Sequence, residues 1–391
     1  MKINFIGGFF LKHKISEYEK NTDGVVNYAA DNLQQAIISG LEMYDDVKLK
    51  LFTAPFLINF PGYKKVFIRA EKFKNFRIVP FVNIKILDSI SKRIALNSII
   101  KKEIENESED NHIIIYGMFD YFVQSLPFNY KNKVCLVVPD LPTMMGGDIR
   151  KLKIRLYYWY LSKVFSKNLS KVDSFVFISK YMQEHIDVGE RPWIVIEGIY
   201  NSQNTLPVQI KEENPTILYT GTLDVRYGIL DLLEAFRLIE DENFTLWICG
   251  EGAGKKDVQQ AVLNDSRIKY FGQVNNKEAL LLQQRATILV NPRKNEGEFT
   301  KYSFPSKTME YLASGTPTVM YKLTGVPDEY HPYFFSPIDN TPVAMKDVLR
   351  KVGNMSEQER FKFGNDAKDF VINHKNPKVQ VGKILKMIKN S

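Results

Sequence analysis

Residues 298–319 read EFTKYSFPSKTMEYLASGTPTV, and they predict a polar loop, a short helix and a buried strand in that order. Pro305 and Ser306 open the predicted helix, because proline is favoured in the first turn of a helix. The helix stops at 314–315, and a strand begins near 318. The first amides of a helix lack partners and its dipole is positive there, so a helix that follows a polar loop offers an anion site.

Two charged side chains of this helix indicate which anion it binds. Lys307 adds a full positive charge in the first turn. Glu310 lies about one turn further in, where a carboxylate can accept hydrogen bonds from two hydroxyl groups. A phosphate at the helix tip and a diol one turn deeper describe a nucleotide diphosphate and its ribose. The stretch therefore predicts a nucleotide site.

The size and charge of the chain limit the class of protein. At 391 residues the chain is long for one domain and comfortable for two. Its 53 basic and 45 acidic residues leave a net charge of +8, which suits an anionic ligand or an anionic membrane surface. No nucleic-acid motif accompanies this charge, so we expect no nucleic-acid partner.

The cysteines and the apolar runs indicate a cytoplasmic protein. Cys135 and Cys249 are the only cysteines, and both lie in apolar runs. We therefore expect two buried free thiols in a reducing cytoplasm rather than a disulfide. Met1 leads straight into a strand without a signal peptide, and no apolar run is long enough to span a bilayer.

Strand-like and helix-like segments alternate in both halves of the chain. Strands are predicted near 2–7, 47–53, 112–116, 134–138 and 174–178, and again near 216–220, 244–249, 268–271, 286–290 and 318–321. Helices are predicted near 25–43, 82–107, 149–170, 180–185, 230–239, 254–264, 276–284 and 306–314. This alternation predicts an α/β protein with two Rossmann-like, doubly wound parallel-sheet domains, at 1–198 and 199–375. Ligands of such sheets bind at the carboxyl ends of the strands, so we expect the site in an interdomain cleft.

Two glycine-containing turns follow strands of the second half. In Tyr219–Gly228, Gly221 permits close approach of the backbone to a ligand, and Arg226 can neutralise a phosphate. The alternative is an ordinary turn with a solvated arginine. In CGEGAG at 249–254, Gly250 and Gly252 resemble a weak dinucleotide fingerprint, and a turn that lines a nucleotide sugar explains them at least as well.

Two further turns offer contacts to a base or a phosphate. The backbone of Gln273 and Val274 can read a base edge after the strand that ends at Phe271. Arg293, in the sequence Asn-Pro-Arg, is a candidate phosphate or sugar contact, as is Lys301. The alternatives are a plain turn after a buried strand and solvated surface residues.

Taken in this order, the motifs resemble the donor half of retaining glycosyltransferases of the GT-B fold. The resemblance is to the large fourth family, which includes enzymes that assemble bacterial capsules, exopolysaccharides and O-antigens. It covers residues 216–330 and rests most on YSFPSKTMEYLASGTP at 302–317. The tail at 376–391 is similar to the helix that crosses back to the first domain in this fold.

The resemblance implies roles for individual residues. Glu310 matches the glutamate that holds the ribose hydroxyls. A second family glutamate, which approaches the transferred sugar, falls at Tyr302, so Glu298 or the backbone of Ser303 and Phe304 would take its place. We expect the loop from Glu298 to Phe304 to decide which sugar is transferred.

The resemblance also locates the phosphate contacts. The usual arginine and lysine of the family fall on Thr222 and Tyr227, and Arg226 and Lys307 are similar in charge and stand as replacements. Together with the amide of Ser306 they would stabilise the leaving diphosphate electrostatically, without a metal or other cofactor. Retention of configuration is implied by the family alone.

The first half contributes fewer candidates. Gly8, in Gly7-Gly8, and Gly24, in Asp23-Gly24, are similar to the glycine loop that meets the donor phosphates. Asp140 follows a strand at the place where related enzymes hold a polar residue near the reacting sugar, and a turn cap is the equal alternative. Asp140, Arg226 and Lys307 are therefore the residues that we expect to act in catalysis. The five histidines show no metal spacing.

Two basic, aromatic segments suit the interface of an anionic membrane, namely Arg150–Lys171 and Phe60–Arg77. The alternative is an amphipathic helix with its aromatic side in the core. Peripheral contact with the inner face of the cell membrane would serve a lipid-linked acceptor.

These features predict a glycosyltransferase that moves a hexose from a nucleotide sugar, on family habit a UDP-sugar, to a glycan or lipid-linked acceptor in surface polysaccharide synthesis. A nucleotide-sugar epimerase of the same fold is one rival, although its chemistry needs carboxylates and histidines that the chain does not clearly provide. A non-catalytic sugar-nucleotide-binding or scaffold protein is the other, because Tyr302 stands in place of a glutamate.

Overall fold

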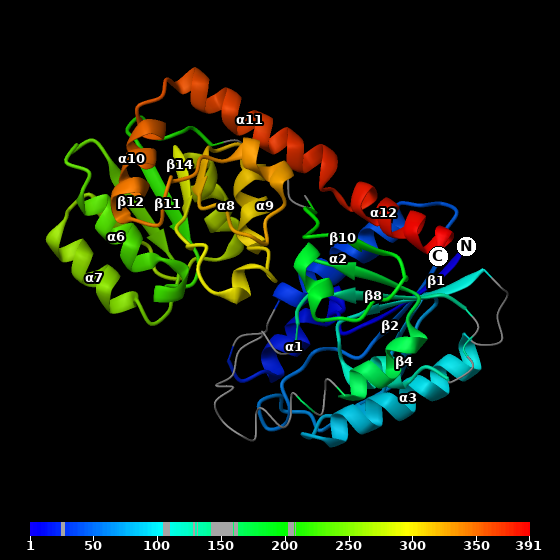
Figure 1. Cartoon of the computed structure of the whole chain (residues 1–391). Helices are drawn as coiled ribbons and strands as arrows, with labels where there is room; N and C mark the ends of the chain where they lie inside the picture. Colours follow the sequence, from blue (N-terminus) through cyan, green and yellow to red (C-terminus); the bar gives the residue numbers. More distant parts are fainter. Residues whose placement is uncertain are drawn as a thin grey trace. The chain divides into compact units, whose positions relative to one another are not determined.

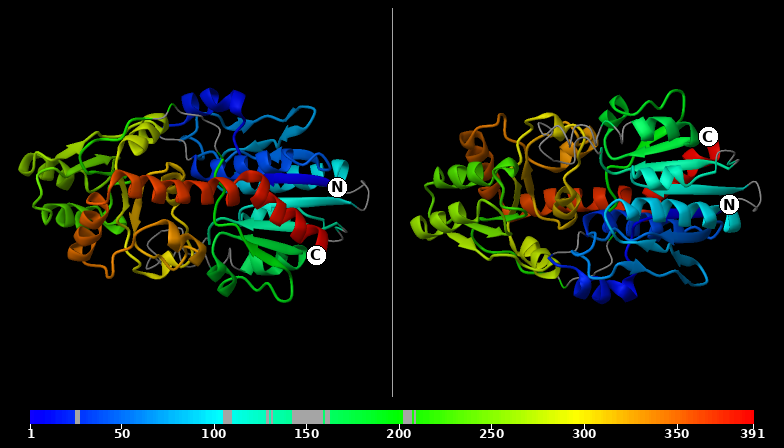
Figure 2. Two further views of the ribbon diagram at one scale, coloured as in Figure 1. Left: turned by 90° about the horizontal axis from the view of Figure 1, so that it is seen from above. Right: turned by 90° about the horizontal axis from the view of Figure 1, so that it is seen from below.

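The chain folds into two compact α/β units, which Figure 1 shows. The computed structural model describes residues 1–24, 28–104, 110–127, 130, 132–141, 159, 163–201, 207 and 209–391. Unit 1 comprises Met1–Ile199 and Pro377–Ser391, and unit 2 comprises Tyr200–Asn376. The two ends of the chain therefore both lie in unit 1 (Figure 2).

The described part of unit 1 contains an eight-stranded sheet in the order β10-β9-β8-β7-β1-β2-β5-β4. Its strands are β1 (Lys2–Gly7), β2 (Lys48–Thr53), β4 (Glu71–Lys72), β5 (Phe76–Ile78), β7 (Asn111–Tyr116), β8 (Val134–Val138), β9 (Ser174–Phe177) and β10 (Trp193–Val195). Neighbouring strands are parallel, apart from β4, which runs antiparallel to β5. Every residue of β7, β8 and β9 is buried, as expected for apolar strands covered on both faces.

Helices and a small second sheet surround the sheet of unit 1. The helices are α1 (Ile15–Asn21), α2 (Ala29–Glu42), α3 (Leu87–Glu103), α4 (Asp120–Gln124) and α12 (Pro377–Asn390), with 3-10 turns η1 (Lys12–Lys14), η3 (Leu169–Lys171) and η4 (Lys180–Glu184). The small sheet pairs β3 (Phe67–Ile68) with β6 (Phe81–Val82) in antiparallel register.

The C-terminal helix α12 belongs to unit 1 because it packs closely on α2. A side chain at Gly40 of α2 would come within 2.4 Å of the Val381 side chain, so only glycine allows this approach. The Tyr44 hydroxyl donates to the carbonyl of Lys378 at 2.8 Å, and the Gln380 amide donates to the carbonyl of Gly198 at 3.0 Å.

The described part of unit 2 contains a five-stranded parallel sheet in the order β13-β12-β11-β14-β15, which is a doubly wound Rossmann-like order. Its strands are β11 (Thr216–Thr220), β12 (Thr245–Cys249), β13 (Ile268–Tyr270), β14 (Ile288–Asn291) and β15 (Thr318–Met320). The helices are α6 (Ile229–Arg237), α7 (Lys255–Asn264), α8 (Asn276–Arg285), α9 (Ser306–Ala313), α10 (Pro342–Gly353) and α11 (Glu357–His374), with 3-10 turns η5 (Val225–Tyr227), η6 (Glu298–Thr300) and η7 (Asp328–Tyr333).

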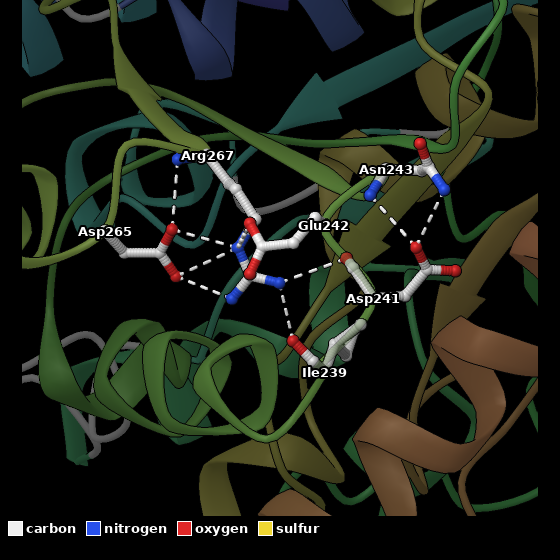
Figure 3. Close-up of polar contacts among 6 residues, drawn as sticks. All are labelled: Ile239, Asp241, Glu242, Asn243, Asp265 and Arg267. Carbon is white, nitrogen blue, oxygen red and sulfur yellow. Dashed lines mark hydrogen bonds and ion pairs between the residues drawn. The ribbon is translucent and has the colours of Figure 1, made fainter.

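The amino-terminal edge of the unit 2 sheet is closed by Arg267, directly before β13 (Figure 3). Its guanidinium donates to both carboxylate oxygens of Asp265, with Nη2 2.7 Å from Oδ2. Nη1 donates to the carbonyls of Ile239 and Asp241 at 2.6 and 3.1 Å, which ties the end of α6 to β13. These hydrogen bonds lower the pKa of Asp265, and the Phe236 ring lies 4.9 Å from the guanidinium carbon.

Several predicted elements are corrected by the structure. Phe60–Arg77 contains the short strands β3, β4 and the start of β5, so it is not an amphipathic helix; the predicted helix at 180–185 is the 3-10 turn η4. The helix predicted from 82 begins at Leu87, because 81–82 pairs with β3 as a strand. Most of Arg150–Lys171 lies outside the described residues.

Two predictions about buried and apolar segments can be compared with the structure. Cys135 and Cys249 are buried free thiols, as predicted. Within the part of the chain that the structure describes, no helix has the length and apolar character needed to cross a bilayer.

Candidate functional site

Glycines at the carboxyl edge of the unit 2 sheet let the loops after β11 and β12 pack against each other. A Cβ on Gly250, whose φ is +141°, would lie 1.8 Å from the carbonyl oxygen of Gly221. A Cβ on Gly252, whose φ is +154°, would lie 2.4 Å from the carbonyl oxygen of Leu223. These predicted donor-binding glycines therefore have a packing role that needs no ligand, and they hold the backbone of both loops at the edge of the sheet.

Gly228 brings the loop after β11 against the loop after β14. Its φ of +80° is left-handed, and a Cβ there would lie 2.1 Å from the carbonyl oxygen of Pro292. The neighbours of these two residues, Tyr227 and Arg293, consequently meet: the guanidinium carbon lies 5.8 Å from the centre of the tyrosine ring. Thr222, earlier in the same loop, is exposed.

Helix α9 begins at Ser306, with Pro305 as its N-cap residue rather than in its first turn. Proline has no side-chain acceptor with which to cap the helix, and Ser306 is exposed. The helix start therefore retains the anion-binding character that the sequence predicts.

Glu310 is held in place by two neighbours within unit 2. Its Oε1 accepts a hydrogen bond from Gln283 Nε2 at 2.6 Å and forms an ion pair with Lys307 Nζ at 2.8 Å. Gln283 lies in α8 and is fully buried, and its Nε2 is also 3.5 Å from the hydroxyl of Thr220. Sequence reasoning missed Gln283, because nothing in the α8 sequence marks it as different from its neighbours.

Arg293 is a buried cation without an acidic partner among the described residues. Only 8% of the residue is exposed. Its Nη2 donates to the hydroxyl of Ser303 at 2.8 Å, and the Phe299 ring centre lies 4.7 Å from the guanidinium carbon. Its Nε is buried without a partner within the described part of the chain, and burial lowers the pKa of Arg293. An uncompensated buried cation favours an anionic ligand beside it.

Arg226, the predicted phosphate contact, has a different environment. Its side chain is 75% exposed and forms an ion pair with Asp224, with Nη2 2.8 Å from Oδ2. The Asp224 carboxylate also accepts the backbone amide of Arg226 at 2.9 Å, which caps η5. Arg226 therefore already has a counter-ion, whereas Arg293 has none among the residues that the structure describes.

The loop at 298–304 is an ordered segment rather than an open polar loop. Glu298 is exposed at the start of η6, whereas Tyr302 is 5% exposed. The Ser303 hydroxyl donates to the carbonyl of Phe299 at 2.9 Å, and the ring of Phe304 lies 5.3 Å from that of Tyr330. The side chain at position 302 thus points into protein.

The predicted base-reading turn follows β13. The amide of Gly250 donates to the carbonyl of Gly272 at 2.8 Å, so this turn joins the same edge of the sheet. Gln273 is exposed, and Val274 packs beside the buried cluster that contains Trp247 and Leu218.

Two candidates in unit 1, Gly8 and Asp140, lie at the carboxyl ends of β1 and β8, and Gly24 follows α1. The amide of Gly8 donates to Gln34 Oε1 at 2.8 Å. A Cβ on Gly8 would lie 2.1 Å from the Phe56 ring, so this glycine also has a packing role. Gly24, with φ of +96°, has no atom within 4 Å of a built Cβ. Asp140 follows β8 and is solvent-accessible, yet desolvation by the surrounding protein raises its pKa to about 6.

Metal ligands are not grouped in the part of the chain that the structure describes. No cluster of three or more histidine, cysteine, aspartate or glutamate side chains there could hold a metal ion. Chemistry without a metal stays an expectation.

Known proteins resemble this chain in sequence over unit 2 and in fold over its whole length. Residues 214–352 match the family model described as Glycosyl transferases group 1. The chain matches none of the curated proteins with which it was compared.

Three solved structures illustrate the similarity of fold. Sucrose-phosphate synthase from Thermosynechococcus elongatus is 13% identical, with a TM-score of 0.64 over 100% of this chain and 99% of that chain. HepE from Anabaena, in complex with UDP, is 12% identical, with a TM-score of 0.64 over 100% of both chains. The lipopolysaccharide outer core galactosyltransferase WaaB, in its apo form, is 16% identical, with a TM-score of 0.58 over 100% of this chain and 99% of that chain. The chain therefore has the GT-B fold with two Rossmann-like units.

Proposed function

We propose that this GT-B chain is a glycosyltransferase that takes a hexose from a UDP-sugar and transfers it, with retention, to a glycan or lipid-linked acceptor in surface polysaccharide synthesis. The observation that carries the proposal is the arrangement in α9, where Glu310 is held one turn behind an uncapped helix start. The match of residues 214–352 to Glycosyl transferases group 1 and the UDP bound by HepE support it.

We assign the nucleotide contacts to four groups in unit 2. Glu310 receives the two ribose hydroxyls, and the amides at the start of α9 receive a phosphate. Lys307, which pairs with Glu310, turns toward that phosphate when the ribose takes up the carboxylate. Arg293 supplies the second charge for the donor anion, because it is buried without an acidic partner among the described residues.

Transfer passes through a centre with oxocarbenium character while the diphosphate leaves. Fixed positive charges in a site closed to water lower the energy of this step, because they are already oriented toward the charge that develops on the leaving group. Asp140 remains our candidate for a contact to the acceptor hydroxyl or the sugar. We expect the reaction to run at the inner face of the cell membrane, where a lipid-linked acceptor would lie.

Nucleotide binding tests the proposal directly. Isothermal titration with UDP should show binding to the wild-type protein and a Kd roughly 10-fold to 100-fold higher for Glu310→Ala, because hydrogen bonds to a charged group contribute about 1.5–3 kcal/mol. Glu240→Ala, an exposed glutamate after α6, is the matched control and should bind UDP like the wild type. Equal Kd values for the two variants would contradict the role of Glu310 and with it the proposal.

A non-catalytic sugar-nucleotide-binding protein is the second candidate, and buried Tyr302 favours it. The side chain at position 302 is a buried tyrosine, so this position supplies no carboxylate to a sugar. Release of UDP from a panel of UDP-hexoses separates the two candidates. A chain that binds UDP with Glu310 dependence and never releases it from any donor is the binding protein.

A further inference from the structure

Helix α3 of unit 1 is apolar on two opposite sides, and one of them faces solvent. Leu96, Ile99 and Ile100 are buried in the unit. Leu87, Ile90 and Ile94 follow the i, i+3, i+7 spacing of a single helix side and are exposed. A helix that is apolar on both sides is normally covered on both sides, so the outer side of α3 lacks a partner. Figure 2 shows α3, in cyan, lying along the outside of unit 1.

The segment before α3 continues this apolar side. Phe67 of β3 is 70% exposed and stands opposite Val82 of β6 in the antiparallel register, so the two share one side of the small sheet. Ile84 follows two residues later, and Ile86, which is 70% exposed, adjoins the start of α3. Ile86 has a φ of +76°, which is strained for a β-branched residue.

Asn83 ties a third segment to the same place. It is fully buried, and its side chain donates to the carbonyl of Ile58 at 3.0 Å. Its own carbonyl accepts the amide of Phe60 at 2.9 Å, and its amide donates to the carbonyl of Val66 at 2.6 Å. Ile58 and Phe60 are both exposed. We use the name apolar face for these exposed side chains of 58–60, of Phe67 and of 84–94.

Cationic residues lie in the same segments as the apolar face. The segment 58–94 holds nine lysine and arginine residues and two acidic residues, Glu71 and Asp88, and four of the nine cations pair with acids outside the segment, namely Lys64, Lys65, Lys72 and Arg77. Asp88 is paired with the buried Lys92 and adds no exposed negative charge to the face. Lys85 lies between Ile84 and Ile86, and Arg69 lies two residues after Phe67; neither forms an ion pair with another described residue.

We infer that the apolar face docks unit 1 onto a bilayer that contains anionic lipid. A contiguous exposed apolar area marks an interaction site, and a cationic rim selects a partner of opposite charge. Apolar side chains would enter the headgroup boundary while Lys85 and Arg69 contact lipid phosphates. The inference deepens the proposed function, because it concerns the membrane in which a lipid-linked acceptor would lie, but it rests on residues outside the nucleotide site.

Vesicle flotation tests the inference. The wild-type protein should float with vesicles of phosphatidylcholine and phosphatidylglycerol at 7:3 and not with phosphatidylcholine alone. The double variant Ile90→Glu, Ile94→Glu should lose binding by at least tenfold, and Lys85→Glu by about fivefold or more, since one cation near an anionic leaflet contributes about that factor. Leu263→Glu is the matched control, because Leu263 is an 80% exposed leucine on α7 of unit 2, and it should bind like the wild type.

Two outcomes would overturn the docking surface. One is equal flotation of the double variant and Leu263→Glu. The other is a wild-type dimer that the double variant converts to a monomer with unchanged flotation, which would make this surface a contact between copies of the chain. Melting curves show whether each variant is folded, and UDP titration shows whether its nucleotide site is intact. A wild-type protein that floats with the vesicles but does not bind UDP would contradict the proposed function and leave the docking surface intact.

Discussion

Unit 2 contains two arginines at opposite edges of the same sheet, Arg267 half-buried and Arg293 buried, and they differ in what surrounds them. Arg267 lies before β13 at the amino edge, where two carboxylate oxygens and two carbonyls accept its hydrogen bonds (Figure 3). Arg293 lies after β14 at the carboxyl edge, where a serine hydroxyl and aromatic rings surround it. Arg267 is half-buried, with 11% of its side chain exposed, and Arg293 is buried, with 8% of the residue exposed, so the clearer difference lies in their hydrogen-bond partners.

The difference indicates which arginine serves the fold and which serves a ligand. Burying a charge without a counter-ion costs free energy, so a buried cation is normally paired. Arg267 fulfils this within the protein. Arg293 has no acidic partner among the described residues, and it lies at the edge where ligands of parallel sheets bind. We therefore expect removal of Arg267 to affect stability and removal of Arg293 to affect binding.

Replacing Arg267 should produce the largest effect. Arg267→Met leaves the Asp265 carboxylate and two carbonyls without their donor, and breaking such a pair costs about 3 kcal/mol or more. We expect urea unfolding to show that loss, while the refolded variant binds UDP like the wild type. Unchanged stability would mean that the pairing in Figure 3 contributes nothing net.

Replacing Arg293 should give the opposite result. Arg293→Met should raise the Kd for UDP about 30-fold, equivalent to about 2 kcal/mol, and should leave the free energy of unfolding unchanged or higher. Arg226→Met is the control, because Arg226 is exposed and paired with Asp224, and it should change the Kd less than threefold. A larger effect for Arg226 than for Arg293 would reverse our assignment.

If Arg293→Met raises the Kd for UDP but not the Kd for UMP, the arginine contacts the β-phosphate. If UDP binds normally and only donors with an acidic sugar are affected, Arg293 contacts the sugar instead. If none of these ligands is affected, the buried cation has no role in donor binding.

Asp140 extends the comparison to an acid at the carboxyl edge of the unit 1 sheet. Desolvation raises its pKa to about 6, so the carboxylate is protonated as the pH falls through that value. If the ionised form accepts a hydrogen bond in the reaction, kcat/KM should fall about tenfold from pH 7 to pH 5. Asp140→Asn should be slow and should lose this acidic limb. A wild-type profile without the limb would argue against Asp140.

Lys211 is an intermediate case, with the smallest expected effect. Its Nζ donates to the carbonyl of Ala286 at 2.8 Å and to the Thr316 hydroxyl, and it has no acidic partner among the described residues. Burial and then the charge of Arg360 lower its pKa from 10.5 to about 7. Between these values the unfolded chain binds more protons than the folded chain, so the free energy of unfolding should rise with pH from about 7 to 10.5.

Urea unfolding at pH 7.0 and pH 9.5 measures this effect. The wild type should gain about 1 kcal/mol relative to Lys211→Met over that interval, because the fully buried limit is reduced by the partial exposure of Lys211. A constant difference between the two proteins would show that Lys211 keeps its charge throughout.

Local signals in the sequence predicted the α9 region well. Proline and glycine mark both ends of the helix at 306–313, and apolar runs mark the strands of both sheets. The Lys307–Glu310 ion pair also follows from the i, i+3 spacing. The sequence motif alone assigns Lys307 to a phosphate and Glu310 to the ribose hydroxyls, and does not indicate that the two side chains pair with each other.

Partners that are distant in the chain could not be predicted in this way. Gln283 reaches Glu310 across 27 residues, and only the packing of α8 beside α9 makes them neighbours. Arg226 and Arg293 both follow strands, and the difference between their environments depends on burial and on Asp224 rather than on the motif. The strands within Phe60–Arg77 are two or three residues long, too short for alternation to distinguish them from a helix.

The return of α12 to α2 has a consequence for the order in which the chain folds during synthesis. Unit 2 is complete once Asn376 has left the ribosome, whereas unit 1 still lacks the helix that fills the space beside Gly40. The first unit to be started is thus the last to be finished. Until then Ile37, Ile38 and Leu41 lack the covering of Val381, Ile384 and Leu385, with which they share one core. Chaperones that bind apolar segments would find their target in the nascent first unit rather than in the second.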